Sequence, residues 1–381
     1  MHSFDFSRIE SLMSTMPQRG IPCAELAVTY RGETVYRVSV GCADAEGKVP
    51  LGPQHLYPLF SCTKIATCTA AMKLVEEGKM GLEDPVSRYL PAFENLYVRE
   101  GNSLRRISHP LRIWHLFTMT GGFNYSYDGT VPLQNVIRVK GFRTRDFVDA
   151  LAQGPLDFEP GTHFQYSLCH DVLGAVVEAV SGLSLGEYMK RVLFDPLGMS
   201  DTTFHPNAEQ KSRMTQAFRF DFPHGTAVPC PDTSDAFVEE RCAFESGGAG
   251  LVSKTDDYIR LMTMLANGGR APDGTVVLRP ETIAQMQVNR LPENCRYDFM
   301  STRLFGYGWG LCGRVHVNPA LSLSRSSVGE FGWDGAAAPF ALADPEKKVA
   351  LYFGTHVHHC NYAYHVLHPL IRDYTYEGLG F

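Results

Sequence analysis

The spacing of apolar residues along the chain alternates between a helical and an extended period. Five segments carry apolar side chains at helical spacing, at residues 4–16, 62–78, 110–119, 171–180 and 255–267. Gly78 and a Gly-Gly pair end two of them as stop signals. Five other runs are typical of strands, at 24–31, 34–42, 311–317, 336–343 and 348–355, and a last helix is expected over 361–373.

Strands near both ends of the chain, with helices between them, predict an α+β fold. We expect residues 1–104 and 241–381 to form one discontinuous domain, an antiparallel sheet flanked by helices. Residues 105–240 are expected to form a second, mainly helical domain, which leaves a cleft between the two. Gly32-Glu33 separates the first two extended runs and predicts a hairpin there.

Composition and charge exclude several classes of protein. Hydrophobic residues make up 44% of the 381 positions and charged residues 20%, which allows a large core and argues against global disorder. The net charge of −6 and the absence of a long basic run make nucleic acid and anionic membranes poor partners. No run approaches the ~20 apolar residues of a membrane span. The N-terminus lacks a basic stretch before an apolar core, so we expect no signal peptide and a cytoplasmic protein.

Cysteine and histidine suggest no metal or cofactor. The ten cysteines are scattered without a Cys-x-x-Cys pair and are expected to be buried or free thiols. Histidines crowd the C-terminus, where His356 and His358 would share one face of a strand, and His365 and His368 one face of a helix. Neither an acidic partner nor tight ligand spacing accompanies them, so we expect no metal site and no cofactor.

Ser61 and Lys64 form the first candidate site. They place a hydroxyl and an amine three residues apart at the start of the segment 62–78, on nearly the same helix face. A serine needs an adjacent base to act as a nucleophile, and a lysine can serve once burial lowers its pKa. Ser61 could equally be an ordinary helix N-cap. Cys62, beside it, is interpreted as a small apolar filler.

Two later sites add chemistry to this pair. Tyr166 precedes a predicted helix start and could reach into a cleft, or could simply pack in the core. In Gly332-Trp333-Asp334-Gly335-Ala336, small residues flank a strand and would let a substrate approach the backbone closely. The N–H of Ala336 could complete an oxyanion hole with that of Ser61, although a plain glycine-rich turn is the alternative.

Two motifs are interpreted as structural. Gly182-Leu183-Ser184-Leu185-Gly186 matches the Gly-x-Ser-x-Gly motif of α/β-hydrolases, but a helical run precedes it where that motif needs a strand. Gly182 is expected to end a helix, and Ser184 to cap the next one with Glu187 in a capping box. Thr255, in Lys254-Thr255-Asp256, is expected to cap the helix that follows.

Together, the three sites resemble the serine β-lactamase-like superfamily, which includes class C β-lactamases, D,D-peptidases and family VIII carboxylesterases. The resemblance runs over nearly the whole chain and includes the stretches at 116–122, 246–258 and 307–311. It implies Ser61 as nucleophile, with Lys64 and Tyr166 sharing the acid and base work. It places Trp333-Asp334-Gly335 where many members have Lys-Thr-Gly, and suggests that Phe123, Tyr125 and Tyr127 line the cleft.

Two departures from the β-lactamase pattern bear on the substrate. Leu168 stands where those enzymes have an asparagine, and Trp333 stands where they have a cation. Both changes remove a polar anchor for an amide or a carboxylate, as in the carboxylesterase branch. We therefore expect a serine hydrolase that cleaves neutral, short-chain carboxylic esters through an acyl-enzyme, with Trp333, Asp334, Gly335, Leu168, Phe123 and Tyr125 around the substrate.

Other functions stay open at this point. The same residues would serve acyl transfer to a small acceptor, or a β-lactamase or D-amino-acid peptidase. A non-catalytic assembly protein on the same scaffold is disfavoured because Ser61, Lys64 and Tyr166 are all present. The partner is expected to be a small-molecule ester or related acyl compound, and the oligomeric state is left undetermined.

Overall fold

The computed structural model describes residues 4–126, 131–139, 141–232 and 243–381. Its centre is a seven-stranded sheet in which every neighbouring pair is antiparallel, as expected from the sequence. In order across the sheet, the strands are β2 (Glu33–Gly41), β1 (Cys23–Tyr30), β13 (Val349–Thr355), β12 (Phe340–Asp344), β11 (Phe331–Asp334), β10 (Arg314–His316) and β9 (Tyr307–Trp309).

Strands from the two ends of the chain meet in this sheet. β1 pairs with β13 from Ala24 opposite Thr355 to Tyr30 opposite Val349. β1 and β2 form the expected hairpin, but its turn is Arg31-Gly32, with φ of 53° and 89°, and Glu33 already belongs to β2. Two successive positive φ angles suit a tight hairpin because they follow the twist of the strands.

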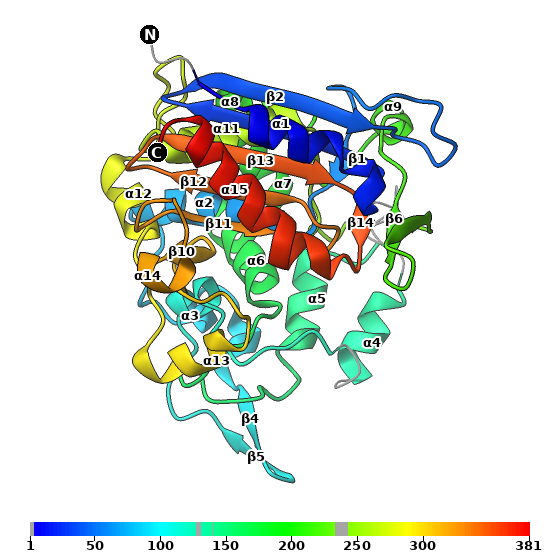
Figure 1. The fold of residues 1–381 in the computed structure, drawn as a ribbon. Coiled ribbons are helices and arrows are strands. Elements are labelled where there is room, and N and C mark those ends of the chain that lie inside the picture. The colour runs from blue at the N-terminus through cyan, green and yellow to red at the C-terminus, as the bar shows by residue number, and fades with distance from the viewer. Residues whose placement is uncertain (1–3, 127–130, 140, 233–242) are drawn as a thin grey trace.

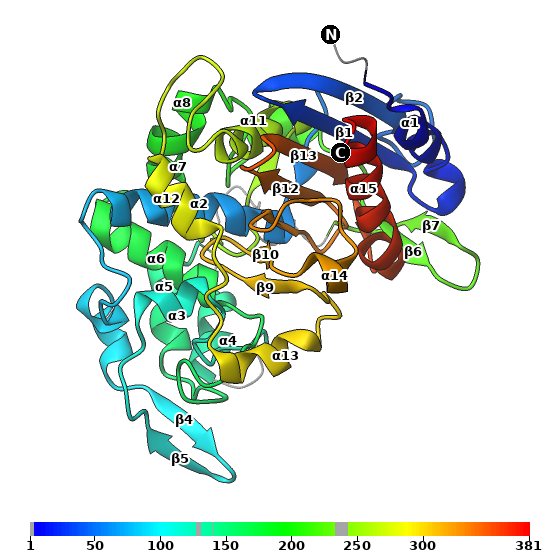
Figure 2. The same cartoon turned by 60° about the vertical axis from the view of Figure 1, so that its left-hand side comes forward.

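Helices cover both faces of the sheet (Figures 1 and 2). On one face lie α1 (Ser7–Ser14) and α15 (His368–Gly378), whose apolar side chains form a core with β1, β12 and β13. On the other lie α2 (Thr63–Glu76) and α11 (Thr255–Ala266), within a larger core that extends into the middle of the chain. The predicted last helix is present, although a π-helical turn at Ala363–Leu367 precedes α15.

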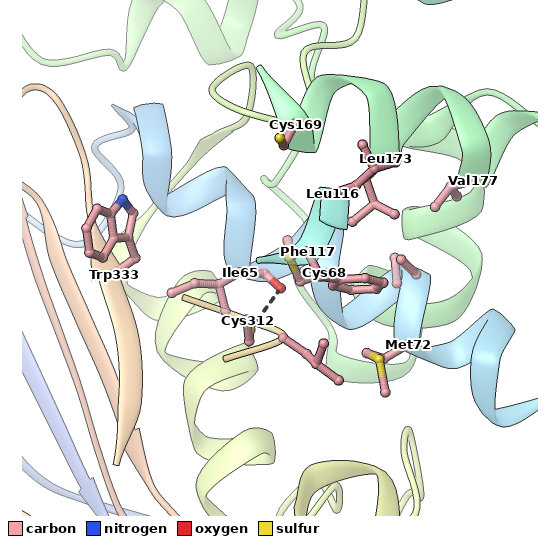
Figure 3. Close-up of a cluster of buried hydrophobic side chains, with 14 of the residues drawn as sticks. Ile65, Cys68, Met72, Leu116, Phe117, Cys169, Leu173, Val177, Cys312 and Trp333 are labelled. Carbon is pink, nitrogen blue, oxygen red and sulfur yellow. Dashed lines mark hydrogen bonds between the residues drawn. The ribbon is translucent and has the colours of Figure 1, made fainter. Parts of the chain in front are cut away.

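The helix α2 differs from its expected amphipathic character. Every residue from Thr63 to Met72 is buried, because α2 packs against α6 (Cys169–Ser181) and also contacts β11 of the sheet. Figure 3 shows Ile65, Cys68 and Met72 on α2, with Leu173 and Val177 of α6 on one side and Trp333 on the other. A helix surrounded by protein needs no polar face. The candidate nucleophile therefore precedes a fully packed central helix.

The middle of the chain is mainly helical, as the sequence predicts. Besides α6 it contains α3 (Ile113–Phe117), α4 (Val131–Ile137), α5 (Thr144–Leu151), α7 (Leu185–Met189), α8 (Asp195–Leu197) and α9 (Ala208–Ser212). It also contributes the antiparallel pair β6 (Phe218–Asp221) and β7 (Thr226–Pro229), of which β6 also pairs with β14 (Val357–His358) from the C-terminal part. The exact domain boundaries remain a prediction.

The remaining elements are short. A hairpin of β4 (Tyr97–Glu100) and β5 (Ser103–Arg106) projects from the lower end in Figure 1. β3 (Tyr57–Pro58) pairs with β8 (Val252–Ser253), next to the candidate nucleophile. The helices α12 (Pro280–Met286) and α13 (Arg296–Met300) connect α11 to β9, and α14 (Pro319–Ser322) lies between β10 and β11.

One predicted helix cap is present in the structure and another is not. Ser184 caps α7 as expected, accepting a hydrogen bond from the Glu187 N–H, and Gly182 ends α6 with a φ of 73°. The expectation for Thr255 is wrong: Lys254 is the N-cap residue of α11, and the Thr255 hydroxyl instead donates to Glu25 on β1. A long-range partner has displaced the local one.

The helices of the protein give little support for a membrane span. In the part of the chain that the structure describes, no single helix is long and apolar enough to cross a membrane. The helix pair Cys169–Ser181 and Leu185–Leu197, bent by 74°, has the length and the apolar composition of a broken span, and nothing else among the described residues marks it as one.

Candidate active site

Ser61 lies in a 3₁₀ turn, Phe60–Cys62, immediately before α2 rather than in its first turn. The turn is held by neighbours on both sides, since Tyr258 donates a 2.7 Å hydrogen bond to the Cys62 carbonyl and Leu59 N–H donates to the Leu251 carbonyl. Phe60 has a positive φ of 45°, a conformation that is uncommon for residues other than glycine. Cys62 is a buried core residue, as expected.

Lys64 is buried, with only 1% of its surface exposed, and points at the nucleophile. Its Nζ lies 3.1 Å from Ser61 Oγ, 3.1 Å from Tyr125 Oη and 2.7 Å from the Gly248 carbonyl oxygen. Burial lowers the pKa of Lys64 from its ordinary 10.5 to about 8, although the buried Asp171 carboxylate acts in the opposite direction. A substantial neutral fraction near neutral pH can accept a proton from Ser61.

The loop around Gly248 connects Lys64 to Asp171 on α6. The Asp171 carboxylate accepts hydrogen bonds from the Ser246 hydroxyl and the Gly248 N–H. A Cβ at Gly247 would come within 2.4 Å of the His170 carbonyl oxygen, so only glycine lets the loop pass this close to α6. Sequence reasoning gave these residues no role, and the glycine pair at 247–248 was the signal available.

Tyr166 immediately precedes α6 and faces Lys64, whose Nζ lies 4.7 Å from the centre of the tyrosine ring. The Trp333 indole N–H donates a 2.9 Å hydrogen bond to Tyr166 Oη. Burial raises the pKa of Tyr166 well above its ordinary value, while hydrogen bonds from Ser61 and Trp333 partly oppose that shift. The phenol is therefore protonated across the physiological range and can act as a proton donor.

An aromatic wall stands beside these groups. Trp333 on β11 lies 4.6 Å from Trp309 on β9 and 5.3 Å from Tyr166, measured between ring centres. Trp309 belongs to the 307–311 stretch of the resemblance, but sequence reasoning did not single it out. Its indole N–H donates to the Phe117 carbonyl, which ties the wall to α3.

The end of β11 approaches the nucleophile turn closely at Gly335. A Cβ there would come within 2.4 Å of the Leu59 carbonyl oxygen, so the small residue serves contact between two parts of the protein's own backbone. Tyr364 donates to the carbonyls of Gly335 and Ala336. Ala336 is exposed, and among the described residues its N–H donates no hydrogen bond. Burial raises the pKa of Asp334 to about 6, with Arg314 opposing the shift.

The residues expected around the substrate occupy different places. Tyr125 is 39% exposed and touches Lys64 through its hydroxyl. Leu168 and Phe123 are only 3% and 4% exposed and belong to the core, so their side chains present no open surface to a substrate in this structure. Tyr127 lies outside the described residues.

The C-terminal histidines separate into two groups. His365 is exposed, and His368 is buried with Nε2 3.0 Å from the Ala338 carbonyl oxygen. His356 and His358 instead converge with Asp232, and the candidate ligand atoms of the three residues lie within 4.8 Å of one another. The expectation that these histidines lack an acidic partner is therefore wrong, because Asp232 is brought in by the fold from a distant part of the sequence.

Comparison with known proteins identifies the class. A family model described as Beta-lactamase matches residues 8–375, so the chain belongs to the beta-lactamase family and is a serine hydrolase with that fold. The chain is 31% identical over 359 residues to Protein Rv1367c of Mycobacterium tuberculosis, which covers 90% of this chain and 87% of that protein.

Two further relatives carry names that describe an activity. Esterase EstB of Burkholderia gladioli is 31% identical over 344 residues, covering 84% of this chain and 81% of EstB. The solved structure of EstCE1, a hydrolase with promiscuous acyltransferase activity, superposes with a TM-score of 0.83 and 26% identity, covering 97% of both chains.

Proposed function

We propose that the protein is a carboxylesterase that cleaves neutral, short-chain esters through an acyl-enzyme on Ser61. The observation that carries the proposal is the 3.1 Å contact between Ser61 Oγ and a buried Lys64 amine whose pKa is lowered to about 8. The similarity to an esterase and to a hydrolase with acyltransferase activity supports the same reaction class. A small-molecule ester is the proposed substrate.

The two proton-transfer residues take different roles in acylation. Neutral Lys64 accepts the proton of Ser61 Oγ as the oxygen attacks the ester carbonyl carbon. Tyr166, protonated because burial raises its pKa, then donates its proton to the departing alcohol oxygen as the C–O bond breaks. The Lys64 ammonium returns a proton to the Tyr166 phenolate, which leaves both groups as they began.

Deacylation uses water in place of Ser61 as the nucleophile, with Lys64 again as the base. Water attacks the acyl carbon and passes a proton to Lys64, and Ser61 Oγ recovers one as it leaves. The N–H groups of Ser61 and Ala336 would hold the oxyanion in both steps. The close approach of Gly335 to Leu59 supports this assignment, since it brings the end of β11 to the nucleophile turn.

The charges around the site favour a neutral substrate. Trp333 puts an indole where related enzymes carry a cation, and its hydrogen-bond donor is already used by Tyr166. Asp334 is mostly ionised at neutral pH, and the nearby Arg314 is paired with Glu330 at 2.9 Å. A carboxylate on the substrate would therefore meet the negative charge of Asp334, whereas the indole of Trp333 suits an alkyl or aryl ester.

The proposal is tested by comparing substrates on one enzyme preparation. We expect kcat/KM for p-nitrophenyl butyrate to exceed that for a chromogenic cephalosporin by more than about 100-fold, since losing one charge-assisted anchor changes affinity about 10- to 100-fold. Ser61→Ala supplies the background rate for both substrates. Equal rates on the two would favour the β-lactamase or D-amino-acid peptidase alternative. Faster product release on adding a small alcohol, with ester formation, would favour acyl transfer.

A further inference from the structure

His356 carries a buried ring nitrogen that is available for a ligand-binding role. It follows β13, is fully buried, and its Nδ1 lies 3.1 Å from the Thr215 carbonyl oxygen. The Thr215 hydroxyl also lies 3.3 Å from Nδ1. The shorter contact is to the carbonyl oxygen, which can only accept, and it favours the tautomer with the hydrogen on Nδ1 and the lone pair on Nε2. That Nε2 atom is buried and has no hydrogen-bond partner within the described residues.

His358 repeats this situation two residues later. Only 7% of its surface is exposed, and its Nε2 is likewise buried without a hydrogen-bond partner in the described part of the chain. The rings of His356 and His358 are 5.5 Å apart, and Phe60 packs its edge against His358 at 5.2 Å. Two buried ring nitrogens that lie close together without a hydrogen-bond partner are rare in folded proteins.

Asp232 adds a negative charge to the same place. One of its carboxylate oxygens lies 3.5 Å from His356 Nε2, and the candidate ligand atoms of all three residues fall within 4.8 Å of one another. The Asp232 side chain is 16% exposed, whereas that of His356 is 0% exposed. The carboxylate thus lies on the solvent side of the cluster and leaves an entry route for an ion.

We propose that Asp232, His356 and His358 form a binding site for a divalent transition-metal ion of the zinc class. Two neutral imidazoles and a carboxylate are a common three-ligand set for zinc, with a fourth position left for water or an anion. Zinc lies about 2.0–2.2 Å from its nitrogen and oxygen ligands. The three candidate ligand atoms, now within 4.8 Å of one another, would need to move only slightly closer together to reach that distance from a shared ion. The Thr215 carbonyl holds the His356 ring in the orientation that presents Nε2 to the ion.

This site is separate from the proton-transfer groups. Phe60, the residue before Ser61, packs against His358, and the ester mechanism assigns no step to a metal ion. The inference therefore stands whether or not the proposed esterase function holds. Its chemistry also selects the ion, because imidazole ligands favour zinc, copper and nickel over magnesium and calcium.

The test measures zinc binding to the full-length, untagged protein after dialysis against a chelator. Isothermal titration with ZnSO₄ should give one ion per chain, and CoCl₂ should produce a visible absorption band. His358→Ala and Asp232→Asn should each weaken zinc binding by at least about 100-fold. Losing a residue that only holds a ligand in place costs about 10- to 100-fold, and losing a ligand should cost at least as much as the upper value. His365→Ala is the matched control, because His365 is an exposed histidine of the same segment.

The decisive variant is Asp232→Asn, which changes a partly exposed side chain with little change of volume and can be checked for folding by circular dichroism. Loss of the zinc isotherm in Asp232→Asn with retention in His365→Ala supports the site. Unchanged affinity in Asp232→Asn, or the absence of stoichiometric binding to the parent protein, overturns it.

Discussion

The hydrogen bond from Trp333 to Tyr166 offers a sharp test of the proton route. Trp333→Phe removes the indole N–H, which lies 2.9 Å from Tyr166 Oη, and keeps an aromatic ring between Trp309 and Tyr166. In the proposed mechanism, Tyr166 becomes a phenolate as the alcohol leaves. The lost hydrogen bond is therefore one to a developing negative charge.

That difference sets the size of the effect. A hydrogen bond contributes about 1.5–3 kcal/mol to a charged group and about 0.5–1.5 kcal/mol to a neutral one. The difference, about 1–1.5 kcal/mol, corresponds at 25 °C to a fall in kcat of about 5- to 13-fold. If Tyr166 stayed neutral throughout, the bond would be equally strong in the ground and transition states, and kcat would barely change. KM should move little in either case.

The assay is steady-state hydrolysis of p-nitrophenyl butyrate under conditions where acylation limits the rate. Trp309→Phe is the matched control, since it also removes an indole donor from the aromatic wall but leaves Tyr166 Oη untouched. The control should lower Tm and change kcat only a few-fold. A kcat for Trp333→Phe within about threefold of the parent, or equal losses in the two variants, would refute Tyr166 as the acid.

Three further predictions follow from the same geometry. Since neutral Lys64 is the base and its pKa is about 8, kcat/KM should rise with pH and level off above about 8, and a flat profile from about pH 6.5 to 9 would exclude this role. Gly335→Ala places a Cβ against the Leu59 backbone and should lower kcat by about 10²-fold, the scale of one lost oxyanion donor; unchanged turnover would argue against the Ala336 N–H. Ser184→Ala should cost about 1 kcal/mol of unfolding free energy in denaturant titrations and leave kcat unchanged, because the Ser184 hydroxyl caps α7 and donates a 3.3 Å hydrogen bond to Glu245.

Local spacing missed the short strands β9 and β11 of the main sheet. It did predict the other five strands of that sheet and the pairing of Ser61 with Lys64. Both depend on short-range geometry, the extended period in one case and the helical turn in the other. The antiparallel sheet built from both chain ends is confirmed, and so is the capping role of Ser184.

Contacts between segments far apart in the chain could not be predicted from the sequence. The Gly248 carbonyl and the Tyr125 hydroxyl reach Lys64 only through tertiary packing, and no local pattern distinguishes them from other loop residues. Burial of Leu168 likewise depends on how α6 packs in the core. Thr255 shows that a tertiary contact can also replace a predicted local one. Its hydroxyl, predicted to cap a helix, donates instead to the Glu25 carboxylate on β1.

Trapping the acyl-enzyme tests the central claim most directly. The protein is mixed with p-nitrophenyl butyrate, quenched in acid during turnover, digested and mapped by mass spectrometry. The account predicts one butyryl group per chain, carried on Ser61 and absent from the Ser61→Ala variant. A butyryl group on Ser184 or any other residue, or turnover that continues undiminished in Ser61→Ala, would contradict it.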